Sequence, residues 1–455
     1  MGRIAASPES FPVMVETLII GAGAAGLIAA LAAHEAGQSV LLLERDAVPA
    51  GSTALSAGLI PAAGTAQQKS AGIEDDPARF AEDIQRKAHD ENDPALVALV
   101  ADNAFRVIDW LTKTHGLNFS VIENFDYPGH SRRRMHGLPS RAGRELVDAL
   151  RARCEALDID ILCGATVETL HVDGNSVTGV SFADPGGNLD SVGAGRVILA
   201  CNGYGGNRDK VRNYMPEIDN AVWFGHDGNT GDALDWGMAL GAQTAHLGAY
   251  QGHGNVAYPH GILITWGTMT EGGVQVNRDG HRFWNESRGY SEAARAVLAQ
   301  PGGVAWAIFD DRIAGVARQF EDFRNAESQG TVRRADTPEA LAEVLGLPPR
   351  TLARTLAGLR DGPDRFGRDF ANTPVLVPPY CGVKVTGALF HTQGGLVIDD
   401  KARVLNGAGQ PFPNLFAAGG AACGVSGKGD DGYLSGNGLL SAAALGWIAG
   451  QHNLN

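Results

Sequence analysis

The hydrophobic pattern is clearest near the start of the chain. Residues 15–20 form an apolar run that predicts a buried strand, and the glycine-rich turn at 21–26 leads into the Ala/Leu-rich segment 27–33, which predicts a helix. A second apolar run at 39–43 predicts another buried strand, which ends at Glu44. The three segments form a strand–helix–strand unit of the kind that builds parallel α/β sheets.

The rest of the chain alternates between helical and strand-like patterns. Turn residues at 173–174 and 185–187 divide residues 159–197 into a predicted β-ribbon. Residues 382–386 and 396–398 read as strands. Helical patterns cover residues 78–114, 337–345, 348–359 and 439–449. No internal repeat interrupts this order, so we expect a mixed α/β protein.

Composition narrows the class of protein. Glycine accounts for 61 of the 455 residues, without the Gly-X-Y period of collagen or the bias of a disordered chain. The 37 basic and 51 acidic residues give a net charge of −14 and form no long basic stripe, so we expect no nucleic-acid partner. The short basic run at 131–134 fits either a solvated loop or a functional one. His130, His136, His253 and His260 lie in unrelated segments and are interpreted as structural or pocket-lining without preference, whereas Tyr127, before the run, is a candidate to reach a pocket.

Cysteine and histidine spacing argues against metals and disulfides. The five cysteines are odd in number and scattered without a CxxC pair, which argues against an iron–sulfur cluster, a c-type haem or a disulfide framework within the chain. No histidines have metal-ligand spacing, so we predict no metal site. No apolar run reaches the 18 residues of a membrane span, and the first 15 residues do not resemble a signal peptide. We therefore expect a cytoplasmic protein without a membrane span.

The turn at 21–26 carries the spacing GxGxxG. In such a unit Gly21 permits the tight turn, Gly23 lets the backbone approach a pyrophosphate, and Gly26 lets the helix pack closely on the strand. The helix N-terminus faces the phosphates, and Glu44 lies where an acid bonds the ribose hydroxyls. NAD and FAD both fit this unit. Its place at residue 21, without a second copy downstream, favours FAD.

Five further segments carry a resemblance to a known family. They are the Gly/Ser-rich loop 51–58, Thr-Gly-Asp at 230–232, Arg-Phe-Trp-Asn-Glu at 282–286, His-Thr-Gln-Gly-Gly at 391–395, and Asn-Leu-Phe-Ala-Ala-Gly-Gly at 414–420. With these motifs the chain resembles the FAD-dependent oxidoreductases of the fumarate reductase, succinate dehydrogenase flavoprotein and 3-ketosteroid dehydrogenase family.

The resemblance implies a fold and a cofactor. The fold is a Rossmann-like FAD-binding domain of the GR2 type, formed by residues 1–220 and 369–455, with an inserted α+β capping domain at 221–368. The loop 51–58 contains no histidine, so noncovalent FAD is expected. The residues expected to bind FAD are Gly21, Gly23, Ala24, Ala25, Gly26, Glu44, Arg45, Gly51, Ser52, Thr53, Ser56, Ala57, Gly58, Val167, Ala200, Asn202, Gly203, Asp232, Gly419, Gly420, Ser435, Asn437, Leu439 and Leu440.

The family's chemistry requires a proton carrier and a group that binds a carbonyl. The enzymes of this group act on a C–C or C=C bond beside a carbonyl, with hydride exchanged at flavin N5. The candidates are Tyr433, His391, Arg288, Tyr290 and Ser435. His391 matches a histidine that holds a substrate carboxylate or carbonyl. Arg288 stands close to the proton-donating arginine of fumarate reductases, one or two residues off, and Tyr290 is the alternative.

Two departures from the fumarate reductase pattern bear on the substrate. Tyr433 stands near the position of an arginine that clamps a second carboxylate, and Gly420 replaces a glutamate that bonds the flavin's ribityl chain. A tyrosine here resembles the ketosteroid dehydrogenases, where it bonds the keto oxygen. We therefore expect α,β-dehydrogenation, or the reverse reduction, of a small cyclic ketone with an external electron acceptor or donor. The alternatives are a fumarate-reductase-like reductase of an unsaturated carboxylate and a flavoprotein subunit of an electron-transfer complex.

Overall fold

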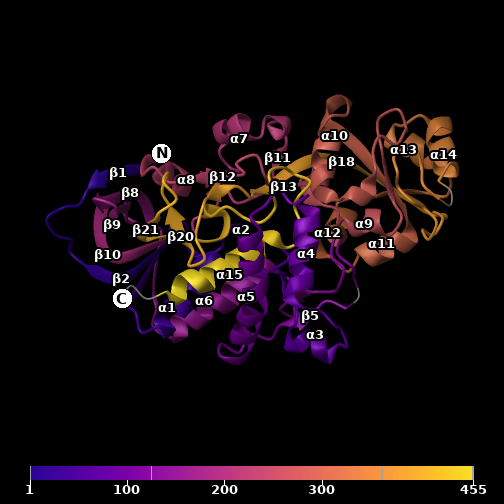
Figure 1. The fold of residues 1–455 in the computed structure, drawn as a ribbon. Helices are drawn as coiled ribbons and strands as arrows, with labels where there is room; N and C mark the ends of the chain where they lie inside the picture. The colour runs from indigo at the N-terminus through magenta and orange to yellow at the C-terminus, as the bar shows by residue number, and fades with distance from the viewer. Residues whose placement is uncertain (1, 124, 360–361, 453–455) are drawn as a thin grey trace. The chain divides into compact units, whose positions relative to one another are not determined.

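The computed structural model describes residues 2–123, 125–359 and 362–452, and the chain divides into two compact units. Unit 1 contains Met1–Tyr214, Gly225–Tyr250 and His391–Asn455, and unit 2 contains Met215–Phe224 and Gln251–Phe390. Strand β1 (Arg3–Ala6) and helix α15 (Asn437–Gln451), the first and last elements labelled in Figure 1, both belong to unit 1. The sequence analysis predicts domain boundaries after residues 220 and 368. These differ from the limits of the two units, and they stay a prediction.

A nine-stranded sheet forms the framework of unit 1. Its main order is β1-β8-β9-β10-β2-β3-β7, and β21 pairs with β10 on one side and β20 on the other. The strands are β1 (Arg3–Ala6), β2 (Met14–Ile20), β3 (Val40–Glu44), β7 (Asp160–Cys163), β8 (Thr166–Asp173), β9 (Ser176–Ala183), β10 (Leu189–Leu199), β20 (Arg403–Leu405) and β21 (Pro411–Ala417). Strand β2 pairs in parallel with both β3 and β10, which confirms the predicted strand–helix–strand unit.

The helices of unit 1 surround this sheet and extend beyond it. They are α1 (Ala24–Glu35), α2 (Gly51–Ala54), α3 (Ala66–Ser70), α4 (Pro77–Lys87), α5 (Pro94–Lys113), α6 (Gly143–Ala156), α7 (Arg208–Tyr214), α8 (Asp232–Ala239) and α15 (Asn437–Gln451). Five short strands complete the unit: β4 (Ile60–Pro61), β5 (Ser120–Val121) and β6 (Met135–Gly137) in one sheet, and β12 (Thr244–Ala245) and β19 (Gly395–Leu396) in another. The predicted helical tract 78–114 is two helices, because Asp93 caps a new helix after the turn at His89 and Asp90, which have positive φ.

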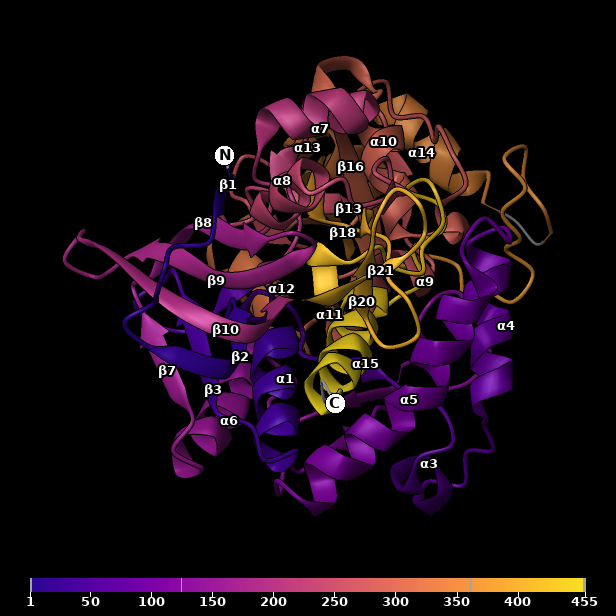
Figure 2. The same ribbon diagram turned by 60° about the vertical axis from the view of Figure 1, so that its left-hand side comes forward.

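Helix α15 packs closely against α1 at two glycines of α15, Gly446 and Gly450. A Cβ at Gly446 would lie 2.5 Å from the carbonyl oxygen of Ala25, and one at Gly450 would lie 2.4 Å from that of Ala29. Both helices are rich in alanine and largely buried, so their backbones approach closely. Figure 2 shows the two helices side by side. The first and last long helices of the chain thus share one core.

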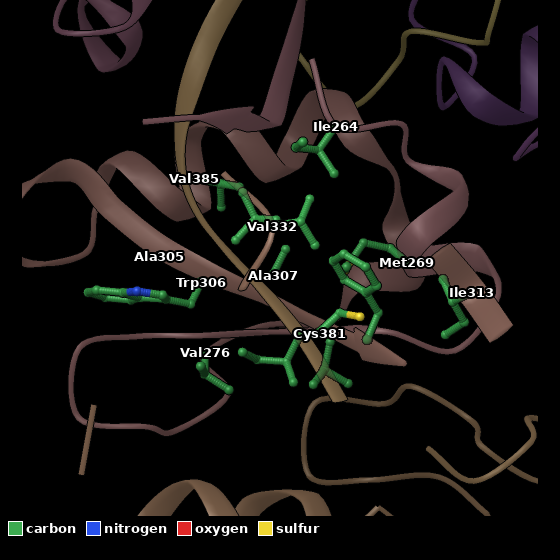
Figure 3. Packing of buried hydrophobic residues seen from close by; sticks show 14 of the residues in the cluster. Ile264, Met269, Val276, Ala305, Trp306, Ala307, Ile313, Val332, Cys381 and Val385 are labelled. Carbon is green, nitrogen blue, oxygen red and sulfur yellow. The ribbon is translucent and has the colours of Figure 1, made fainter. Parts of the chain in front are cut away.

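Unit 2 is built on a seven-stranded sheet of order β14-β13-β18-β16-β15, with β11 and β17 also pairing with β18. The strands are β11 (Val222–Trp223), β13 (Tyr250–Ala257), β14 (Ile262–Leu263), β15 (Val274–Val276), β16 (Val304–Asp310), β17 (Arg333–Ala335) and β18 (Tyr380–Thr392). The helices are α9 (Gly267–Thr270), α10 (Tyr290–Leu298), α11 (Asp311–Ala317), α12 (Glu321–Ser328), α13 (Pro338–Leu345) and α14 (Pro349–Ala357). Figure 3 shows the hydrophobic core of this unit, with Trp306, Ile313 and Val385 among its residues.

A buried ion cluster stabilises unit 2 around the Arg-Phe-Trp-Asn-Glu segment. The guanidinium Nε of Arg282 donates to Glu286 at 2.9 Å, and Arg368 lies 3.1 Å from the other carboxylate oxygen. Glu286 also accepts the backbone N–H of Gln275 at 2.9 Å. All three charged side chains are buried, so the charges compensate one another. The sequence motif therefore has a structural role here.

Candidate functional site

The glycine-rich turn between β2 and α1 has the geometry that its spacing predicts. Gly21 has a φ of +103°, and a Cβ at this position would lie 2.6 Å from the carbonyl oxygen of Ala200. A Cβ at Gly26 would lie 1.9 Å from the carbonyl oxygen of Gly21. Both positions require glycine for steric reasons. The Glu44 carboxylate accepts the backbone N–H of Ala22 at 2.6 Å, which ties the end of β3 to the turn.

The loop after β3 closes around the same turn. The N–H of Ala24 donates to Oγ1 of Thr53 at 3.1 Å. The Ser52 hydroxyl oxygen accepts from the side-chain amides of Asn202 at 2.9 Å and Asn229 at 2.8 Å. Three segments far apart in the sequence therefore meet at α2. A Cβ at Gly23 would have only Thr53 Oγ1 within 4 Å, at 3.5 Å, so the face of this glycine stays open.

Gly420 stands where the family has a glutamate that bonds the flavin's ribityl chain. In this structure the side chain of Asn202 lies beside that glycine. Asn202 has a φ of +67°, and its side-chain oxygen accepts the N–H of Gly203 at 2.8 Å. A Cβ at Gly420 would lie 2.2 Å from that same oxygen. The asparagine side chain therefore occupies the space into which a side chain at 420 would extend.

The other predicted cofactor residues also lie in unit 1. Gly51, Ser52 and Thr53 form α2, Val167 lies on β8, Ala200 follows β10, and Asp232 begins α8. Arg45 lies against Gly228, where a Cβ would meet its guanidinium. Ser56, Ala57 and Gly58 follow α2, Gly419 begins a short 3-10 turn, and Asn437, Leu439 and Leu440 lie in the first turn of α15.

Two buried polar atoms on α15 fit a bound cofactor. The side-chain oxygen of Asn437 and the hydroxyl of Ser441 are buried and have no hydrogen-bond partner among the described residues. An orphaned acceptor or hydroxyl of this kind is costly unless a ligand satisfies it. Together with the open face of Gly23 at the α1 N-terminus, they form a cradle whose donors and acceptors suit FAD.

His391 and Tyr433, two of the predicted catalytic residues, lie in contact in unit 1. Their rings meet edge to face, with centroids 5.5 Å apart and planes at 75°. Burial lowers the pKa of His391 to about 4, so the imidazole is neutral at pH 7. Burial also raises the pKa of Tyr433, although the backbone N–H groups of Gly438 and Gly436 face its phenol oxygen. The pair therefore presents two neutral hydrogen-bonding groups.

The basic run 131–134 is not wholly a solvated loop. Arg134 is 1% exposed and forms a bidentate ion pair with Asp75, with both distances 2.9 Å, and a second ion pair with Asp83 at 2.5 Å. The Arg134 guanidinium also lies 3.3 Å from Nδ1 of His130. On its other side, His130 Nε2 lies 2.9 Å from the carbonyl oxygen of Ser435. The solvated-loop reading is thus wrong for Arg134, because two buried carboxylates compensate its charge. Arg132 and Arg133 are exposed.

Unit 2 carries the remaining candidates. Tyr290 begins α10 and stacks on His253, with ring centroids 5.1 Å apart, and His253 stacks on Phe390 at 5.4 Å. Burial lowers the pKa of His253 to about 3, so this histidine is also neutral. Arg288 is exposed in the short 3-10 turn before α10. No sequence pattern distinguishes His253 from the other histidines.

The structure describes no helix suited to crossing a membrane and no cluster of metal-ligating side chains within residues 2–123, 125–359 and 362–452.

Comparisons with known proteins decide the family. The model of the FAD binding domain family matches residues 16–439. The chain belongs to this family of flavoproteins. The flavoprotein is 32% identical to a probable fumarate reductase of Shewanella frigidimarina, over 99% of this chain and 76% of that one. These matches confirm the predicted FAD and the predicted resemblance.

Solved structures confirm the predicted fold class. An open conformation of a flavocytochrome c3 fumarate reductase superposes with a TM-score of 0.82 and 30% identity, covering 97% of the flavoprotein and 78% of that chain. The 3-ketosteroid-Δ4-(5α)-dehydrogenase of Rhodococcus jostii RHA1 has a TM-score of 0.79 and 24% identity, covering 99% of both chains. The flavoprotein is an FAD-dependent oxidoreductase of the fumarate reductase type, and it shares its fold with 3-ketosteroid dehydrogenases.

Proposed function

We propose that the flavoprotein removes or adds hydrogen across a carbon–carbon bond next to the carbonyl of a small cyclic ketone. The observation that carries this proposal is the pairing of a buried, neutral Tyr433 with a neutral His391. A neutral phenol and a neutral imidazole suit an uncharged carbonyl oxygen better than a second carboxylate. Bound FAD supplies the exchange of hydride.

In this proposal Tyr433 binds the carbonyl oxygen. Its raised pKa keeps the phenol protonated at physiological pH, so it donates a hydrogen bond as negative charge develops on the oxygen. His391 is a second candidate donor, and Ser435 lies two residues after Tyr433. We assign proton transfer to Tyr290 rather than Arg288, because Arg288 is exposed whereas Tyr290 is half-buried among aromatic rings.

Sequence identity favours a second candidate function. The relative from Shewanella frigidimarina is a probable fumarate reductase, and it shares 32% of its aligned residues with this chain. A reductase of an unsaturated carboxylate would use His391 as the anion-binding group and Arg288 as the acid. The neutral state of His391 argues against this assignment, and so does the absence of an arginine at position 433.

Anaerobic flavin spectroscopy separates the two functions. Oxidised protein is mixed with 5α-androstane-3,17-dione, a saturated cyclic ketone, and the loss of the flavin absorbance is followed. Reduced protein is mixed with fumarate, and the return of the absorbance is followed. The first function predicts rapid bleaching by the ketone. Rapid reoxidation by fumarate without bleaching by the ketone contradicts it.

Two variants assign the residues. We expect Tyr433→Phe to slow ketone-dependent bleaching by about 100-fold, the usual loss of one preorganised donor, while FAD remains bound. Arg288→Ala is the matched control, and its ketone rate should stay within twofold of the wild type. An unchanged rate in Tyr433→Phe together with an inactive Arg288→Ala variant favours the carboxylate reductase.

We also propose that the FAD is noncovalent and that an external redox partner completes the cycle. The absence of histidine from residues 51–58 supports the first point. Acid precipitation should leave the yellow colour in the supernatant, and a coloured pellet would contradict this.

A protein that turns over with a dye acceptor acts alone, whereas one reoxidised only by a partner protein is a subunit of an electron-transfer complex. The cytoplasmic location stays a prediction.

A further inference from the structure

Four side chains of unit 1 form a continuous hydrogen-bond relay that ends on His391. The Asn437 amide nitrogen donates to the Ser426 hydroxyl oxygen at 3.0 Å. The Ser426 hydroxyl donates to the Gln393 amide oxygen at 2.6 Å. The Gln393 amide nitrogen lies 3.0 Å from Nδ1 of His391. Gln393, Ser426 and Asn437 are all at most 5% exposed, so water does not compete strongly for these groups.

With the orientations that the two side-chain amides have in the structure, the chemistry of each group sets the direction of the relay. An amide nitrogen only donates, so the Ser426 oxygen accepts from Asn437 and its own hydrogen is directed to Gln393. The amide oxygen of Gln393 is thereby engaged, and its NH₂ group is left facing His391. A neutral imidazole that accepts at Nδ1 carries its proton on Nε2.

The Nε2 edge of the ring lies beside a glycine and not beside a side chain. A Cβ at Gly438, in the first turn of α15, would lie 2.8 Å from both Cε1 and Nε2 of His391. Among the described residues, both polar contacts of this imidazole involve Nδ1. The amide nitrogen of Gln393, at 3.0 Å, requires Nδ1 to accept, whereas the carbonyl oxygen of Thr392, at 3.2 Å, requires it to donate. The two contacts favour opposite tautomers, and the shorter one sets the tautomer that we expect. The relay thus holds one nitrogen, while the bare glycine leaves the other edge free of a side chain.

We infer that Gln393 is a positioning residue that holds His391 neutral with its proton on Nε2, so that His391 binds a carbonyl oxygen as a hydrogen-bond donor and does not act as a base. The consequence for a substrate rests on the proposed function, whereas the position of the proton does not. Because the relay begins at Asn437, a predicted cofactor residue, it also connects the histidine to the first turn of α15.

The position of the proton is directly measurable. The FAD-bound protein, labelled with ¹⁵N-histidine, is studied by two-bond ¹H–¹⁵N NMR at pH 7, and the His391 signals are assigned by their loss in His391→Asn. We expect the pattern of the Nε2–H tautomer. The Nδ1–H pattern, or that of a doubly protonated ring, overturns the inference. Tyr433 is a titratable side chain packed on this ring, so the Tyr433→Phe protein is measured in parallel and should keep the same pattern.

Substitution of Gln393 tests the cause. In Gln393→Glu the carboxylate can only accept at neutral pH, so we expect the imidazole proton to move to Nδ1 or the ring to become doubly protonated. Gln410→Glu places the same charge at an exposed position and should leave the pattern unchanged. An unchanged pattern in Gln393→Glu contradicts the assigned role.

Two further measurements keep the outcomes distinct. If Gln393→Glu does not fold, Ser426→Ala releases the Gln393 amide and should give a mixture of tautomers; a single Nε2–H tautomer in that variant contradicts the role. The spectra need no substrate. A protein with the Nε2–H tautomer that fails to react with the ketone therefore contradicts the proposed function and leaves this inference standing.

Discussion

At the residue scale, two positions of the turn between β2 and α1 accept only glycine for steric reasons. Gly21 and Gly26 stand where a Cβ would collide with backbone oxygens, and the spacing GxGxxG identified both. The burial of Arg134 was not predicted, because its carboxylate partners Asp75 and Asp83 lie far from it in the sequence. Gln393 lies inside a recognised motif, yet its role depends on contacts with Ser426 that no local pattern encodes.

Gly26→Ala tests the close packing of α1 on the turn. The added methyl group would lie 1.9 Å from the Gly21 carbonyl oxygen, so the backbone must move. We expect a loss of about 1–3 kcal/mol in the free energy of unfolding and weaker FAD binding. Urea unfolding and flavin titration measure the two effects. Gly315→Ala, where nothing lies within 4 Å of the new methyl group, is the control and should not lower either quantity.

At the element scale, long periodic segments were predicted closely, whereas strand lengths set by pairing were not. Strand β2 begins one residue before the predicted run, and α15 extends two residues beyond the predicted helix at each end. Strand β18 continues from Tyr380 to Thr392, well beyond the predicted 382–386, because it pairs with β16, β11 and β17 along its length. Such pairing between distant segments is not visible in a single sequence.

Arg134→Met tests how strongly one ion cluster joins α4 to the segment before β6. The substitution leaves Asp75 and Asp83 buried without their common counter-charge, so we expect a loss of about 3–5 kcal/mol in stability. Thermal unfolding with the flavin bound measures the loss. Arg132→Met removes a charge from an exposed neighbour and should change stability by less than about 0.5 kcal/mol. Equal effects of the two substitutions would refute the role of the cluster.

At the scale of the whole molecule, buried histidines make stability depend on pH. Burial lowers the pKa values of His130, His136 and His391 to about 4 and that of His253 to about 3. In the unfolded chain these groups bind protons near pH 6.5, whereas the folded chain binds them only at lower pH. The stabilisation is therefore complete above about pH 6.5 and is lost as the pH falls toward 4.

We expect the urea midpoint to fall steadily between pH 6.5 and 4, with each neutral histidine contributing at most about 1.4 kcal/mol per pH unit. His136→Asn should make this dependence shallower, because it removes a titrating ring that contacts Thr65 and the carbonyl of Arg134. A midpoint that is constant over this range, or a variant with the same slope as the wild type, would contradict the assignment.

The packing of α1 on α15 also has a consequence for how the protein is made. The sheet that carries the FAD cradle receives β21 from the end of the chain, and α15 supplies Asn437 and covers α1. A ribosome synthesises the dinucleotide turn first and these elements last, with the whole of unit 2 in between. During translation residues 1–214 therefore wait for these elements, and we expect cofactor loading to follow the synthesis of unit 2 and of α15.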